Sequence, residues 1–336
     1  MRSKLIAQTN FLKQVCCGVL LSACAVSSGT NAAAAAPNWK PEKNVELIAG
    51  SPPGGGVDRT VRIMQKIMQD SRLIDVTTSV MNKGGGGGAL AWAYLNQHAG
   101  DPHYLSIITP SMLTNRITGG SSLTPEDFTL IALLFSEYLG FAVKADSGIA
   151  TARDLLDQLR KNPASLSIAI GTTFNQVGVA MVAKSAGIDF KKLKIVSFKA
   201  GSESIAALLG GHVDIVASSP ANLAKLQDAG QIRVVALAAP QRLPGAYANV
   251  PLWRELGVDA VATNARGVIG PRGIKEGEAA YWEAIMAKLA QTADWKKSLE
   301  RFFFTNTYMS GAESKRFWNS QYDEIKVLLT ELGLAK

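Results

Sequence analysis

The sequence predicts an α/β protein of two lobes, and three observations support that prediction. The chain has 336 residues, enough for two domains at roughly 150 residues each. After Lys43, short β-branched runs alternate with amphipathic helical stretches, which is the pattern of βαβ units around a largely parallel sheet. Hydrophobic residues make up 47% and charged residues 18% of the chain, so each lobe can bury a core, and a disordered or collagen-like protein is excluded.

The first lobe is predicted from a repeated unit of strand, glycine loop and helix. Strands are expected where β-branched residues cluster, and helices where apolar residues recur three and four positions apart. These patterns predict strands at 45–49, 76–81 and 104–108 and helices at 59–69 and 89–97. A glycine-rich loop follows each of the first two strands.

The second block of alternating elements begins with a clear helix start. Thr151 and Asp154 have the spacing of a capping box, and Pro163 lies just past the end of the helix that they begin. The same alternation predicts helices at 176–186, 202–209 and 221–229 and strands at 166–170, 195–197, 213–217 and 234–238. The last stretch of the chain is predicted to be helical, with Trp282 and Trp318 among its core residues.

The first 36 residues are predicted to be an export signal. Basic residues precede an apolar run at 15–26, and small residues follow through Ala36. The run is shorter than the roughly 20 residues of a membrane-spanning helix. Two cleavage sites are open. An A-x-A site at 32–36 makes 1–36 the signal peptide, whereas a lipobox ending at Cys24 makes 1–23 a lipoprotein signal and 24–37 a tether. Both place the mature protein in the periplasm, in the second case lipid-anchored through Cys24.

Composition excludes several kinds of chemistry in the mature chain. The cysteines, Cys16, Cys17 and Cys24, all lie in the leader, which excludes disulfides and thiolate catalysis. Without the leader's cations, 32 basic residues remain against 27 acidic ones, and this scattered excess does not predict a nucleic-acid partner. The three histidines form no metal-binding motif, and there is no nucleophile elbow. We therefore expect no enzyme activity, no metal and no cofactor.

Two glycine-rich loops are the candidate binding elements. Residues 51–58 (SPPGGGVD) and 82–89 (NKGGGGGA) each join a strand to a helix, where backbone N–H groups and the helix dipole favour an anion. Loops after parallel strands of one sheet open on the same crevice, so a small carboxylate is the expected ligand. The P-loop order is missing because Lys83 precedes the glycines, and any polyglycine satisfies the dinucleotide pattern. Asp58 is expected to cap the following helix, to contact the ligand, or both.

Four motifs, in order along the chain, resemble those of the Bug-type receptors, the TctC-like substrate-binding subunits of tripartite tricarboxylate transporters. They are PPGGGVD at 52–58, NKGGGGG at 82–88, Gly201 with 208–214, and Val250-Pro251 with Glu255 and Gly257. The resemblance extends from about residue 41 to the end of the chain. At 172–175 the sequence TTFN departs from the family's Ser/Gly-rich run, so the contact to the far end of the ligand stays open.

The resemblance implies the fold of a type II periplasmic binding protein, with two α/β lobes, a ligand cleft and a two-crossover hinge. We expect residues 41–140 and 264–336 in lobe 1 and residues 141–263 in lobe 2, because β-rich runs near 140–143 and 261–265 flank the second block. The implied function is that of a monomeric extracytoplasmic receptor that captures a small carboxylate by lobe closure and delivers it to two integral-membrane transporter subunits. A receptor for a two-component sensor, or a periplasmic carboxylate-processing enzyme, is the alternative.

The expected ligand-binding residues come from both glycine loops and from the polar starts of later helices. They are Pro53, Gly54, Gly55, Gly56, Asp58, Gly85, Gly86, Gly87, Gly88, Ala89, Asn115, Thr172, Thr173, Asn175, Gly201 and Ser202. Backbone N–H groups and hydroxyls are expected to bind the carboxylate in preference to a buried arginine pair, with Arg116 and Arg266 as solvated residues at the cleft edge. A valine in place of Gly55 or Gly86 is expected to abolish binding, because the loop needs positive φ and open space there.

Overall fold

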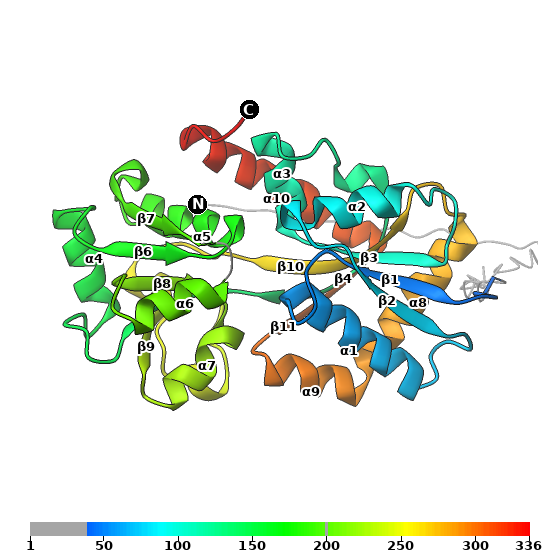
Figure 1. The fold of residues 1–336 in the computed structure, drawn as a ribbon, viewed down its shortest axis with the longest axis horizontal. Coiled ribbons are helices and arrows are strands. Elements are labelled where there is room, and N and C mark those ends of the chain that lie inside the picture. Colours follow the sequence, from blue (N-terminus) through cyan, green and yellow to red (C-terminus); the bar gives the residue numbers. More distant parts are fainter. Residues whose placement is uncertain (1–38, 199–200) are drawn as a thin grey trace, which may run out of the picture. The chain divides into compact units, whose positions relative to one another are not determined.

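Two β-sheets organise the part of the chain that the computed structural model describes, residues 39–198 and 201–336. The first sheet has six strands in the order β11-β4-β10-β3-β1-β2, and the second has five in the order β7-β6-β8-β5-β9 (Figure 1). We call the first sheet with its helices lobe 1 and the second with its helices lobe 2. The predicted export signal, with Cys24 and the other cysteines, lies outside the described residues.

Lobe 1 combines a parallel core with antiparallel strands. Strand β1 pairs in parallel with β2 and β3, and β10 runs antiparallel to β3 and β4. The strands are β1 (Val45–Ala49), β2 (Thr78–Asn82), β3 (Tyr104–Ile108), β4 (Phe128–Glu137), β10 (Asn264–Pro271) and β11 (Thr305–Ser310). The helices are α1 (Gly56–Asp70), α2 (Ala89–Asn96), α3 (Pro110–Thr118), α8 (Glu276–Gln291), α9 (Ala293–Arg301) and α10 (Gly311–Glu331).

Lobe 2 follows the same alternation of strand and helix. Its strands are β5 (Leu139–Lys144), β6 (Ser167–Ile170), β7 (Lys194–Ser197), β8 (Ile215–Ser218) and β9 (Ile232–Ala238). Its helices are α4 (Ala152–Lys161), α5 (Thr173–Ser185), α6 (Gly201–Leu209) and α7 (Pro220–Asp228). The predicted capping box is present, since the Thr151 and Asp154 side chains each accept a hydrogen bond from the other's backbone N–H.

The chain crosses between the two sheets at two places. Strand β4 of lobe 1 leads into β5 of lobe 2 through Tyr138 alone, and the chain returns through 261–263 into β10. Helix α5 packs directly on both crossings at Gly178. A Cβ atom at Gly178 would lie 2.5 Å from Leu139 Cδ2 and 3.0 Å from Ala262 Cβ. A side chain at Gly178 would therefore require Leu139 and Ala262 to shift.

The structure differs from the prediction at several elements; helix α3 was not predicted, and two strands differ more clearly. The end of the chain was expected to be helical throughout, but β11 lies between α9 and α10 and pairs with β4 at the edge of the sheet. The short polar segment TNTYMS carries no alternation that would predict a strand. The patterns also do not predict β4, because its sequence FTLIALLFSE is mostly buried on both faces and has neither period.

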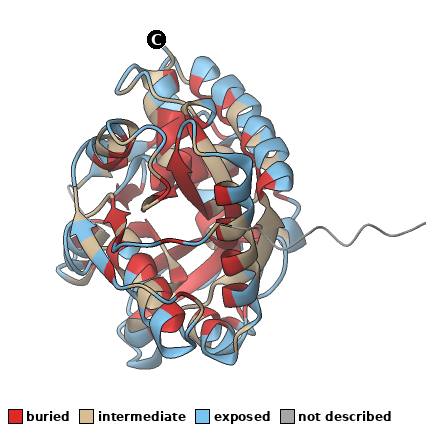
Figure 2. Cartoon of the chain, turned by 90° about the vertical axis from the view of Figure 1, so that its right-hand side faces the viewer, coloured by how far each residue is buried: buried red, intermediate tan, exposed pale blue. Residues whose placement is uncertain are grey.

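The core of each lobe lies between its sheet and the helices that cover it. Figure 2 shows the buried residues concentrated in the strands and on the inner faces of the helices. Trp282 and Trp318, both predicted as core residues, are fully buried. The Trp282 indole N–H donates to the Pro102 carbonyl at 2.8 Å, which satisfies its polar atom. Within 39–198 and 201–336, none of the helices has the length and apolar character needed to cross a bilayer.

Candidate functional site

A cleft with two chambers lies between the lobes. The first chamber, about 660 Å³, is lined by the first glycine loop, α1 and β10 on one side and by the starts of α5, α6 and α7 on the other. The second chamber, about 480 Å³, is lined by the second glycine loop and α3 on one side and by 170–173, Gln176 and 197–198 on the other. Thr172 lines both chambers. Their volumes are typical of small-molecule sites.

Most of the predicted site residues line this cleft. Those in the first chamber are Gly54, Gly55, Gly56, Thr172, Asn175, Gly201 and Ser202. Those in the second chamber are Gly86, Gly87, Asn115, Thr172 and Thr173. The predicted residues that line neither chamber are Pro53, Asp58, Gly85, Gly88 and Ala89. Both glycine loops therefore contribute to one cleft, each through its central residues.

The first glycine loop needs glycine at position 55, but not for the predicted positive φ. Gly54 has φ +80°, but Gly55, the N-cap of α1, has φ −67°. A Cβ atom at Gly55 would lie 2.7 Å from the Ser51 hydroxyl oxygen, which accepts a hydrogen bond from the Asp58 N–H. The expectation of positive φ at Gly55 is therefore wrong, and close packing on Ser51 excludes a side chain there.

The Asp58 side chain fixes the first glycine loop by hydrogen bonds. The N-cap prediction for Asp58 is wrong, because Gly55 occupies that position and Asp58 lies in the first turn. Its buried carboxylate accepts hydrogen bonds from the Gly54 N–H (2.8 Å), Asn82 Nδ2 (2.8 Å) and Arg62 Nε (3.0 Å). Burial alone would raise the pKa of Asp58, but these hydrogen bonds outweigh it and hold the pKa below its ordinary value.

Replacing Asp58 by Asn is expected to lower the free energy of unfolding by about 1.5–3 kcal/mol at neutral pH, because charged acceptors are lost. Since folding lowers the pKa of Asp58, its contribution is full above the unfolded pKa of about 3.9 and disappears as the pH falls through the folded value. Denaturant unfolding at pH 7 and at about pH 3 measures the gap in free energy of unfolding between the parent protein and the Asp58→Asn variant. A gap of the same size at both pH values would contradict the role of the charge.

The second glycine loop has four successive residues with positive φ. The φ angles of Gly85, Gly86, Gly87 and Gly88 are +135°, +56°, +63° and +107°. A Cβ atom at Gly88 would lie 2.8 Å from the buried Trp92 ring. Asn115 Nδ2 of α3 donates to the Gly86 carbonyl at 2.7 Å and fixes the loop to its neighbour. The positive φ predicted at Gly86 is confirmed.

Free N–H groups remain in both loops. Within the described part of the chain, the backbone N–H groups of Gly86 and Gly87 have no acceptor, nor have those of Gly56 and Val57 at the start of α1. Successive free N–H groups of left-handed residues form a concave donor site for an anion. The second loop is therefore preformed to bind an acceptor oxygen.

The start of α5 contributes fewer free donors than predicted. The Thr172 hydroxyl caps α5 by accepting from the Asn175 N–H (3.2 Å), and it donates to Asn175 Oδ1 (2.7 Å). Its proton is thus engaged with Asn175. Thr173 and Ser202 line the cleft with hydroxyls that have no partner among the described residues. These two hydroxyls are the better candidates for donors from lobe 2.

A buried ion pair lies at the base of the first chamber. Arg266 of β10 and Glu137 of β4 are 6% and 5% exposed, and Arg266 Nη2 donates to Glu137 Oε1. Arg266 Nη1 donates to the Gly56 carbonyl and to Thr60 Oγ1 (2.8 Å). The expectation of Arg266 as a solvated residue is therefore wrong. Arg116 is exposed on α3 and lines neither chamber.

Glu137 also connects the lobes, and sequence reasoning did not find it. Besides Arg266, its carboxylate accepts from Asn264 Nδ2 of β10 (2.7 Å) and from Ser219 Oγ at the start of α7 (2.8 Å). A single acid at the end of an apolar ten-residue run was the available signal. Arg59 of α1, which lines the first chamber, was also missed, although it directly follows the glycine loop.

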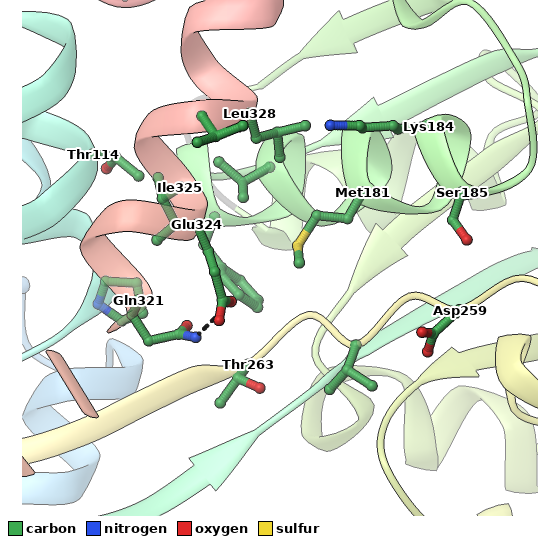
Figure 3. A pocket seen from close by; sticks show the side chains of 15 residues that line it. Thr114, Met181, Lys184, Ser185, Asp259, Thr263, Gln321, Glu324, Ile325 and Leu328 are labelled. Carbon is green, nitrogen blue, oxygen red and sulfur yellow. Dashed lines mark hydrogen bonds between the residues drawn. The ribbon is translucent and has the colours of Figure 1, made fainter. Parts of the chain in front are cut away.

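A third hollow lies between α5 and α10 and differs in character from the cleft. Its volume is about 360 Å³, and Phe174 lines both this hollow and the first chamber. In Figure 3, Met181, Ile325 and Leu328 surround it, and Gln321 donates to Glu324 at its edge (3.0 Å). Neither glycine loop lines this hollow. In 39–198 and 201–336 there is also no cluster of His, Cys, Asp or Glu that could hold a metal ion.

Two α/β lobes, two chain crossings and a polar cleft define the class of type II solute-binding proteins. The chain belongs to the tripartite tricarboxylate transporter family receptors, because the model of that family, TctC, matches residues 61–334. A UPF0065 protein from Cupriavidus necator is 26% identical over 299 residues, 88% of this chain and 89% of the relative. BugT of Bordetella pertussis is 23% identical over 246 residues, 69% of this chain and 72% of the relative.

Solved structures of similar proteins have the same fold. A TctC solute-binding protein from Polaromonas has a TM-score of 0.72 and 22% identity, covering 87% of this chain and 99% of its own. A Rhodopseudomonas palustris protein solved with adipate has a TM-score of 0.77 and 19% identity, covering 88% and 99%. MatC of the same organism, solved with malate, has a TM-score of 0.72 and 18% identity, covering 86% and 99%. The family match makes this chain a solute receptor of the tripartite tricarboxylate transporter family.

Proposed function

We propose that this receptor captures a small carboxylate in the periplasm by closing its lobes and delivers it to two integral-membrane subunits of a tripartite tricarboxylate-type transporter. The observation that carries the proposal is the cleft between the lobes, into which both glycine loops bring free backbone N–H groups. Malate and adipate in two proteins of the same fold support a carboxylate as the ligand.

The donors of the cleft favour an anion over a neutral ligand. Gly86 and Gly87 provide adjacent N–H groups, and Thr173 and Ser202 provide hydroxyls from the opposite lobe. A carboxylate has only acceptor sites, so it can engage such donors without leaving a donor of its own unpaired. Donors from both lobes also favour closure, because a ligand held by both stabilises the closed state by its extra contacts.

Two mature forms of the receptor follow from the leader. Cleavage within 32–36 would give a free periplasmic protein, and cleavage before Cys24 would give an acylated protein on a tether. Mass spectrometry of the mature N-terminus distinguishes the two forms. An unprocessed N-terminus on protein isolated from its own host would contradict export.

A thermal-shift screen tests the proposed function. The panel contains malate, citrate, adipate, hexanoate, benzoate and glutamate, with glucose and putrescine as neutral and cationic controls. A ligand that binds only the folded state at about a hundredfold excess over its Kd adds about 2.7 kcal/mol to the stability. We expect at least one carboxylate to raise the Tm and both controls to leave it unchanged. A panel in which only a control raises the Tm would contradict the proposal.

A further inference from the structure

We infer that Arg59 is the charge-selecting residue of the cleft and that the ligand carries an anionic group there, attached to an apolar body. This inference rests on the proposed function and specifies its ligand. Among the described residues, three charged ones line the first chamber: Arg59, Glu137 and Arg266. The described residues that line the second chamber are all uncharged. Within 39–198 and 201–336, the cations that could recognise the anionic end of a ligand therefore line the first chamber.

Arg266 is not available to the ligand. Its Nη1 and Nη2 atoms donate to Gly56, Thr60 and Glu137, and its Nε atom is fully buried. Its charge is matched by Glu137, which lies in the same buried pair. A ligand carboxylate could reach Arg266 only by displacing Glu137 and leaving that carboxylate buried without its cation. The pair therefore contributes no net charge to the chamber.

Arg59 is available and is held in place. It is half-buried, and it forms no ion pair within the described part of the chain. Its guanidinium carbon lies 4.9 Å from the centroid of the Phe302 ring. A ring contact of this kind uses the face of the guanidinium and leaves its N–H groups free to donate at the edge. Among the described residues, Arg59 thus gives the first chamber one positive charge that is not paired with an acid.

Both polar and apolar side chains line the first chamber. The large apolar residues that line it are Phe174 of α5, Ile205 and Leu209 of α6, Leu226 of α7, and Phe304. A hydrocarbon chain or ring packed on these five side chains is stabilised by burial, whereas a carboxylate placed directly against them would lose its water. The chamber can therefore hold the hydrocarbon body of a fatty or aromatic acid whose anionic group meets Arg59.

Calorimetric titration with hexanoate, benzoate and adipate, and with the neutral amides of the first two, tests the inference. Arg59→Ala is compared with Arg301→Ala as its matched control. The Arg301 guanidinium lies 5.4 Å from the same Phe302 ring, but Arg301 lines neither chamber. We expect at least one of these acids to bind, Arg59→Ala to weaken it roughly 10- to 100-fold, and Arg301→Ala to leave its affinity within twofold. The amides are expected to bind weakly and equally to all three proteins.

Three other outcomes would contradict, in turn, the role of Arg59, the apolar body of the ligand and the proposed function. An Arg59→Ala protein with an unchanged Tm and an affinity for the acid within threefold of the parent would overturn the role of Arg59. Binding of malate or citrate alone would overturn the apolar body while leaving the carboxylate receptor in place. Failure of every carboxylate in both panels would overturn the proposed function itself.

Discussion

Replacing Arg266 by Ala is expected to lower the free energy of unfolding by about 3–5 kcal/mol, the cost of leaving a buried charge without its partner. Glu137 would keep Asn264 and Ser219 as hydrogen-bond donors but would lose its only cation within the described part of the chain. Denaturant unfolding of the purified protein measures the loss. The effect is expected in both lobes, because Glu137 contacts residues of each.

Two comparisons show whether the loss comes from the buried charge. In the double variant Arg266→Met with Glu137→Leu, no charge remains, so most of the stability should return. Arg242→Ala breaks an exposed pair with Glu255 and should cost less than about 1 kcal/mol. If the double variant were as unstable as the sum of its single variants, shape rather than charge would explain the loss.

Replacing Gly86 by Val is expected to reduce affinity for the ligand identified by the screen at least about a hundredfold. Gly86 has φ +56°, and a β-branched residue there is strained by more than the 1–2 kcal/mol typical of left-handed residues. The loop would relieve that strain by turning the N–H groups of Gly86 and Gly87 away from the second chamber. For a diacid that spans both chambers, losing two hydrogen bonds to the carboxylate in the second chamber, at about 1.5–3 kcal/mol each, gives the expected factor.

Gly230→Val provides the matched control for this loss of affinity. Gly230 follows α7 with φ +66°, and a Cβ atom there would meet nothing within 4 Å. The substitution therefore introduces the same backbone strain but changes no wall of the cleft. Calorimetric titration of both variants should show affinity lost only with Gly86→Val. Equal affinity in the two variants would mean that the second loop is a turn without a binding role.

Several helices and strands of both lobes could be predicted from the sequence because their signals are local. The helix at 152–161 has its cap within four residues, and the strand at 104–108 is a short β-branched run between turns. Strand β11 could not be predicted, because its only support is pairing with β4 at the sheet edge. Its own sequence has no strand pattern, so tertiary pairing decides its conformation.

The charged part of the site could not be predicted for a related reason. Glu137 and Arg266 are 129 residues apart, and only the sheet brings them together. Each residue read alone fits a solvated position, so the sequence pattern pointed to the wrong environment for Arg266. The acid next to Arg59 in the sequence, Asp58, is bound by Arg62 and Asn82. The glycines could be recognised because backbone conformation restricts a position locally, whereas charge pairing does not.

Gly178 lies in α5, whose first turn lines the cleft, and packs beside the two chain crossings. A glycine inside a helix costs roughly 0.5–1 kcal/mol relative to alanine, so α5 is a weaker helix than it could be. In return its backbone packs closely against Leu139 and Ala262, which adjoin the two chain crossings, and we expect this contact to act as a pivot when the lobes close. The first residue of α5 lies only roughly 8 Å along the axis from this pivot, at 1.5 Å per residue. Because this distance is short, a rotation of lobe 2 about the pivot would displace Thr172 and Thr173 little. Closure would then move the more distant walls of the cleft toward donors that are already in position.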